Sequence, residues 1–192
     1  DTIEEWFDVR FQADLYVSES GVTGAGSLNG IDPAVMEELL QDPNIKYADI
    51  MRICYAKPAE GVTVLAGVDL GHWSEKARQI WLKKPGELKA VNGAEPALVS
   101  ETFARRFHVL KGGIVELQTP AGSKKISPFG IFCDYGNEFG MAAVDQEKWL
   151  SWVGVDRPVN ASLYLADTSQ VKETRERTVS YTHLTLPTIL LV

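Results

Sequence analysis

Cysteine, basic charge and long apolar runs are all scarce in this 192-residue sequence. Its two cysteines exclude a disulfide-rich scaffold and a zinc site with four thiolate ligands. The 19 Lys and Arg residues against 26 Asp and Glu give a net charge of −7, which argues against nucleic-acid binding because phosphate recognition needs clustered positive charge. No segment approaches the roughly 20 apolar residues of a transmembrane helix.

Sequence motifs for nucleotide, nucleophile and zinc chemistry are missing as well. There is no G-x-x-x-x-G-K-[ST] loop for ATP, no G-x-S-x-G for a nucleophilic serine and no H-E-x-x-H for zinc. His72 and His108 are far apart in the sequence. Gly24, Gly26 and Gly30 form G-x-G-x-x-x-G, one residue longer than the dinucleotide fingerprint, so a flexible loop is favoured over a cofactor site. The sequence therefore predicts neither a cofactor nor a metal ion.

The composition, 45% hydrophobic and 23% charged, is that of a globular domain. The sequence begins at Asp1 without a methionine or a signal peptide, from which we expect a piece of a longer protein. Residues 179–192 carry no charged side chain when His183 is neutral, and residues 179–184 resemble the translation of a sequencing-library adapter. A second membrane helix is the alternative, but Pro187 interrupts its short apolar part. We therefore treat 179–192 as a non-native tail and predict that it forms no helix or strand packed into the core.

Helices and strands alternate along the rest of the sequence. Asp32 and Pro33 mark a helix start, because Asp caps the first amide groups and Pro suits the first turn. Ser100 and Asp145 cap two further helices. The predicted helices cover residues 33–40, 73–82, 100–107 and a segment after Asp145, and the predicted strands cover 13–18, 45–56, 62–68, 114–118, 125–134, 141–144 and 160–166. This order predicts an α+β fold in which helices pack on mixed sheets.

The densest polar cluster is a turn that contains Asp134, Tyr135, Asn137 and Glu138. Two carboxylates could act as acid and base or hold a cation, but catalytic carboxylate pairs flank a cleft from separate elements. Tyr135 offers a large contact area, and Asn137 and Glu138 offer directional polar contacts. We therefore predict that this turn contacts a partner. The alternative is that its residues only form the turn.

The order and spacing of several short segments carry a further signal. Residues 65–69 read LAGVD, residues 98–107 read LVSETFARRF and lead to a double glycine, and residues 128–138 read PFGIFCDYGNE. Together with ADLYV at 13–17 and the helix-then-strand pattern at 33–45, they resemble the extracytoplasmic domain of FtsX-like ABC transporter permeases, the MacB-like periplasmic core domain. The resemblance spans roughly residues 2–167. It implies a C-terminally truncated domain that lacks the last helix and strand of the family.

The resemblance also implies a place and a role. The segment is expected on the extracytoplasmic (periplasmic) side of an inner or plasma membrane, without enzymatic activity of its own. A separate cytoplasmic ABC ATPase subunit would hydrolyse ATP, and membrane helices would transmit its motion to this domain for export or for handling of envelope substrates. A periplasmic adaptor or a lipoprotein is an implied partner, and the full transporter is expected to be a dimer. Two alternatives stay open: a soluble envelope hydrolase, or a ligand-binding module, that uses the turn at 134–138.

Further expectations concern domain boundaries and single residues. Residues 1–12, whose apolar residues have helical spacing, are expected to form a membrane-proximal helix with Trp6 at the membrane interface. Residues 13–178 are expected to form the extracytoplasmic domain, with an inner subdomain at about 62–145. Cys54 and Cys133 lie between apolar neighbours on predicted strands, so both are expected to be buried free thiols. A disulfide between them is the alternative, because an oxidising compartment would allow it.

Overall fold

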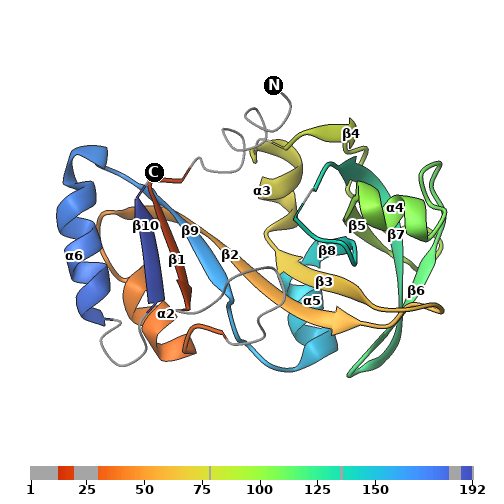
Figure 1. Ribbon diagram of the computed structural model, residues 1–192, viewed down its shortest axis with the longest axis horizontal. Coiled ribbons are helices and arrows are strands. Elements are labelled where there is room, and N and C mark those ends of the chain that lie inside the picture. The colour runs from red at the N-terminus through yellow and green to blue at the C-terminus, as the bar shows by residue number, and fades with distance from the viewer. Residues whose placement is uncertain (1–12, 20–29, 78, 135, 182–186, 192) are drawn as a thin grey trace. The chain divides into compact units, whose positions relative to one another are not determined.

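The computed structural model describes residues 13–19, 30–77, 79–134, 136–181 and 187–191. The predicted membrane-proximal helix with Trp6, the glycines at 24 and 26, and Tyr135 lie outside the described residues. The chain divides into two compact units (Figure 1). Unit 1 comprises residues 1–52 and 156–192, and unit 2 comprises residues 53–155.

Unit 1 is built on an antiparallel sheet. Its strands are β1 (Leu15–Glu19), β9 (Asn160–Leu165), β10 (Pro187–Leu191) and the first part of β2 (Ile45–Ala56), whose last residues belong to unit 2. The helical elements are α2 (Pro33–Leu40), the 3₁₀ turn η1 (Thr168–Gln170) and α6 (Val171–Tyr181). The strands follow the order β10-β1-β9-β2, and neighbouring strands are antiparallel (Figure 1).

Helix α2 covers the apolar face of this sheet. Alternate residues of β9 are buried, as expected of a strand with one covered face. The buried cluster joins side chains of β1, β9 and α2: Leu15, Val17, Met36, Leu39, Ala161 and Leu163. The helix begins where the sequence predicts, because Asp32 accepts a hydrogen bond from the Ala34 amide at 2.8 Å and Pro33 occupies the first turn.

Unit 2 has a mixed sheet with three helices. Its strands are β3 (Thr63–Val68), β4 (Trp81–Lys83), β5 (Glu95–Ser100), β6 (Val115–Thr119), β7 (Gly122–Phe132) and β8 (Met141–Asp145). The helices are α3 (Leu70–Glu75), α4 (Glu101–Arg106) and α5 (Gln146–Val153). In the order β3-β8-β5-β7-β4, the pairs β3·β8 and β5·β7 are parallel and the others antiparallel; β6 pairs with β7. The predicted α+β class is confirmed.

The core of unit 2 forms where α5 and α4 contact the strands. Trp149 of α5 is buried, and its indole N–H donates a hydrogen bond to the Leu65 carbonyl of β3 at 3.0 Å. This approach needs a glycine on β3, because a Cβ atom at Gly67 would lie 2.6 Å from the Cβ of Trp149. Phe103 of α4 is fully buried in the same cluster.

The prediction of a helix over residues 73–82 is wrong for its second half. Helix α3 ends at Glu75, and residues 81–83 form the short strand β4, which pairs with the end of β7. The apolar spacing of these residues suits a helix, but unpaired backbone groups along β7 favour an added strand there.

The tail, predicted to form no helix or strand packed into the core, does take up regular structure. Helix α6 continues to Tyr181, and β10 pairs with β1 over its whole length. The physical reason is that strand pairing uses backbone groups, so an open edge such as that of β1 accepts an extended segment without side chains selected to fit it.

Candidate functional site

The predicted contact turn lies between β7 and β8 in unit 2. A carboxylate oxygen of Asp134 accepts a hydrogen bond from the Gly136 amide at 3.0 Å, and the side-chain carbonyl of Asn137 accepts one from the Phe139 amide at 3.0 Å. Asp134 is 8% exposed and Asn137 is 6% exposed. These two side chains point into the structure and hold the backbone of the turn.

Among the described residues of this segment, the outward side chains are those near its end. Glu138 is exposed, and the next residue, Phe139, is 42% exposed. Sequence analysis singled out Glu138 but missed Phe139, which reads as an ordinary core residue. Nothing in the sequence distinguishes this phenylalanine from its buried counterparts such as Phe103.

Arg106, at the end of α4, ties the turn to the helix. One guanidinium nitrogen, Nη1, donates hydrogen bonds to the carbonyl oxygens of Val62 at 2.8 Å and Phe139 at 3.2 Å. The guanidinium carbon lies 5.4 Å from the centre of the Phe107 ring, within cation–π range. The Arg105–Arg106 pair, which the sequence presents as a solvated face, thus contains one residue with a fixed position.

An aromatic pair completes this surface. The rings of Tyr55, near the end of β2, and Phe139 pack edge to face with centroids 6.3 Å apart. Tyr55 is 39% exposed, so both rings reach the surface of unit 2. We call Tyr55, Arg106 and Phe139 the aromatic–arginine surface.

Ser100 has a structural role, and the two histidines lie at separate places in unit 2. The hydroxyl oxygen of Ser100 accepts hydrogen bonds from the amides of Phe103 at 3.2 Å and Met141 at 2.9 Å, which caps α4 and joins it to β8. His72 lies within α3, whereas His108 follows the end of α4 with a positive φ of 57°. In the part of the chain that the structure describes, no three His, Cys, Asp or Glu side chains gather as metal ligands.

Both cysteines are free thiols, but each is half-buried rather than fully buried as predicted. Burial raises the pKa of the Cys54 thiol to about 11, so this thiol stays protonated at neutral pH. Cys54 packs against the core cluster of unit 2. It therefore acts as a small apolar side chain and not as a nucleophile.

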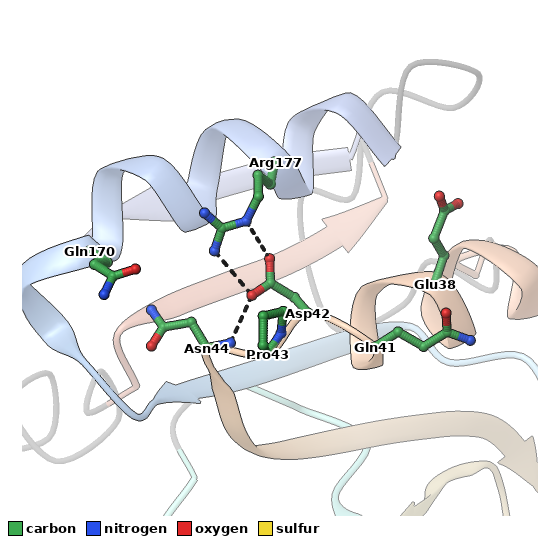
Figure 2. Close-up of a pocket in the computed structure, with 7 residues that line it drawn as sticks. All are labelled: Glu38, Gln41, Asp42, Pro43, Asn44, Gln170 and Arg177. Atoms are coloured by element: carbon green, nitrogen blue, oxygen red, sulfur yellow. Dashed lines mark hydrogen bonds and ion pairs between the residues drawn. The ribbon is translucent and has the colours of Figure 1, made fainter.

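Unit 1 has an open polar cavity of about 670 Å³ (Figure 2). Its lining residues come from the end of α2, the connection to β2, η1 and α6: Glu38, Gln41, Asp42, Pro43, Asn44, Gln170 and Arg177. Figure 2 shows the Arg177 guanidinium pointing at the Asp42 carboxylate, with Nε–Oδ2 and Nη2–Oδ1 distances of 2.7 and 3.1 Å. Hydrogen bonding to Arg177 lowers the pKa of Asp42 below its ordinary value.

Several polar groups at this cavity bind one another. The Asn44 side chain donates to the Thr174 hydroxyl at 2.9 Å and accepts from the Asp167 amide at 2.9 Å. Together with the Asp42–Arg177 pair, these bonds fasten α6 to the start of β2. These bonds give this part of the cavity a structural role.

Comparisons with known proteins bear on the fold. No protein-family model and no curated protein sequence matches the chain. Among solved structures, the chain matches the periplasmic region of MacB from Actinobacillus actinomycetemcomitans with a TM-score of 0.59 at 9% identity, covering 100% of this chain and 94% of that one. The fold is that of this periplasmic region.

A second solved structure agrees with this MacB-like fold. The extracellular domain of YknZ, a noncanonic ABC-type transporter from Gram-positive bacteria, matches with a TM-score of 0.56 at 15% identity, covering 94% of this chain and 98% of that domain. Over the described residues, no helix has the length and apolarity needed to cross a bilayer. The resemblance found in the sequence is confirmed at the level of the fold.

Proposed function

We propose that the chain is the extracytoplasmic domain of an FtsX-like ABC transporter permease, and that it acts mechanically in export or in the handling of envelope substrates. The match of nearly the whole chain to extracytoplasmic domains of MacB and YknZ supports this proposal. The structural roles of Ser100, Asp134 and Cys54 agree with a domain that is not itself an enzyme.

The proposal implies specific partners. A cytoplasmic ABC ATPase would supply the energy through membrane helices that flank this segment, and residues 1–12 would form the membrane-proximal connection with Trp6 at the interface. Residues 13–178 would make up the periplasmic domain, with 179–192 as a non-native tail. A periplasmic adaptor or lipoprotein would bind the domain, and the transporter would be a dimer.

Within the predicted contact turn, the burial of Asp134 and Asn137 favours Glu138 as the residue that meets a partner. Asp134 and Asn137 would support the contact by fixing the turn. Tyr135, between them, remains part of the proposed contact.

The first test is the gene that encodes the chain. The proposal expects a membrane span on each side of this segment and an ABC ATPase that co-purifies with the product. A parent protein without membrane spans would contradict it and would favour a soluble envelope protein.

The second test measures transport in the full protein. Glu138→Ala is expected to lower transport while leaving folding and basal ATP hydrolysis unchanged, because the residue would act in contact and not in catalysis. Glu75→Ala, an exposed carboxylate at the end of α3, is the matched control and should transport normally. Full transport by Glu138→Ala would leave this turn without a contact role.

A further inference from the structure

Arg106 is a surface cation held in one position. Its Nη1 is hydrogen-bonded to two carbonyl oxygens, and its guanidinium carbon lies 5.4 Å from the centre of the Phe107 ring. Gly61 makes room for it, since a Cβ atom there would lie 2.0 Å from Nη2. Gly61 also has a φ of +78°, a conformation that suits glycine. The side chain has therefore lost most of its rotamer freedom before any ligand arrives, which lowers the entropic cost of binding.

The charge of Arg106 is not neutralised within the described part of the chain. Both of its hydrogen-bond acceptors there are neutral carbonyls, and no described carboxylate pairs with it. The neighbouring Arg105 differs, because its Nη2 lies 2.6 Å from a carboxylate oxygen of Glu101. A fixed guanidinium whose bonds in the described part of the chain come from Nη1 alone is suited to a charged hydrogen bond with a carboxylate.

An apolar contact area adjoins this cation. Phe139 accepts a hydrogen bond from Arg106 through its carbonyl oxygen, and its ring is 42% exposed. The ring packs against Tyr55, which holds it in place. Aromatic residues and arginine are the side chains most enriched at the energetic centres of protein interfaces.

We propose that the aromatic–arginine surface binds a segment of a partner protein in which an Asp or Glu side chain stands next to an apolar side chain. The carboxylate pairs with Arg106, and the apolar side chain covers Phe139. The proposal concerns the surface of unit 2 alone and holds independently of the transporter role.

A protein segment fits this surface better than an anionic membrane does. Attraction to acidic lipids needs clusters of roughly four to eight basic side chains, whereas this surface presents one fixed cation. The exposed rings supply the apolar area that a peptide side chain covers.

The test selects peptides on the full 192-residue chain from a random library displayed on phage, with the Arg106→Gln chain used to remove binders that do not need the cation. Recovered peptides are expected to carry Asp or Glu beside an apolar residue. A synthetic peptide from this set should bind at least about tenfold more weakly to Arg106→Gln and to Phe139→Ser than to the parent chain. A second peptide, in which an amide replaces the carboxylate, should bind Arg106→Gln no more weakly than the first peptide does, because the ion pair is already lost. Arg105→Gln, the adjacent control, should bind within about twofold of the parent chain.

Circular dichroism establishes that each variant is folded, and Phe139→Ser still tests the surface if Arg106→Gln fails to fold. Recovered peptides without acidic residues, or equal binding by the parent chain and Phe139→Ser, would overturn the proposal. So would Arg106-dependent binding to phosphatidylglycerol vesicles, which would assign the surface to a membrane. None of these outcomes alters the transporter proposal, which depends on flanking spans and an ATPase.

Discussion

Asp42 has no exposed side-chain surface, and yet its carboxylate is ionised at neutral pH because Arg177 lies beside it. A buried carboxylate without a cation costs several kcal/mol of free energy. Removing one member of the pair is therefore expected to lower the free energy of unfolding by more than the intact pair adds to it. Both residues come from the part of the chain that precedes the predicted tail. The pair joins positions far apart in the sequence and fixes α6 on unit 1.

Replacing Arg177 by Met should lower the free energy of unfolding by about 1–3 kcal/mol at pH 7, because Asp42 loses a charged hydrogen-bond partner. The folded-state pKa of Asp42 is lowered, so the stabilisation is fully present above the ordinary Asp pKa of about 4 and is lost as the pH falls toward the lowered value. The gap between parent and variant should therefore narrow below about pH 4. Urea unfolding at a series of pH values measures it.

Lys172→Met, an exposed position on the same helix, is the control and should change stability little at any pH. If Arg177→Met lost the same stability at low and at neutral pH, the ion pair would not be the cause. The lost interaction would then be apolar contact by the arginine stem.

Gly67 sets a second constraint on a single residue, because its Cα faces the Trp149 side chain. Gly67→Ala should destabilise the protein by about 1–3 kcal/mol or more through overpacking, measured by urea unfolding. Gly86→Ala is the control, because the nearest atom to its new Cβ is 3.7 Å away, an ordinary contact. Equal effects of the two substitutions would mean that α5 moves away from β3 without cost.

At the scale of elements, the sequence predicted what local chemistry controls. The caps at Asp32, Ser100 and Asp145 begin α2, α4 and α5 as expected, since each side-chain oxygen accepts a bond from a nearby amide. It did not predict β4 or α6. The strand β4 depends on pairing with β7, and α6 is highly charged and depends on Asp42, so partners distant in sequence determine both.

The candidate site was likewise predictable from the sequence only in part. The polar sequence of residues 134–138 correctly predicts a turn, because Asp and Asn side chains bond to amides two residues ahead. The aromatic–arginine surface could not be predicted, since its three residues come from separate elements and their exposure depends on the fold.

The pairing of β10 with β1 can be tested by ending the chain at Tyr181. Unit 1 should still unfold cooperatively, because its apolar cluster lies among β1, β9 and α2. The β1 amides that face β10 should exchange with deuterium faster, while those that face β9 keep their protection. Hydrogen exchange resolved by NMR measures both sets, and the β9 amides serve as the control. Loss of cooperative unfolding on truncation would show that the tail is an integral strand.

At the scale of the whole molecule, unit 2 is one continuous stretch inserted between two parts of unit 1. The chain enters and leaves it at adjacent points, because Arg52 Nε lies 2.6 Å from Asp156 Oδ1 and the Val159 amide donates to the Met51 carbonyl at 2.8 Å. Unit 2 also has its own apolar cluster around Phe103 and Trp149. These are properties of an inserted domain.

Residues 53–155 produced alone should therefore fold, with a cooperative unfolding transition and the fluorescence of buried tryptophans. The measurement is thermal unfolding followed by tryptophan emission and by far-ultraviolet circular dichroism. Coincident transitions are expected from the two signals. A fragment without a transition would show that unit 2 needs unit 1 to fold.

The Arg52–Asp156 junction also bears on the order of events during synthesis. All of unit 2 leaves the ribosome ahead of β9, so it can begin to fold while β1, α2 and β2 still lack their central partner strand. Once folded, it holds residues 52 and 156 near each other and replaces a long flexible loop by a short rigid one. Folding of unit 2 has then already closed the loop, so pairing β9 with β1 and β2 carries little further entropic cost. Unit 1 can therefore assemble as though its two parts were neighbours in sequence.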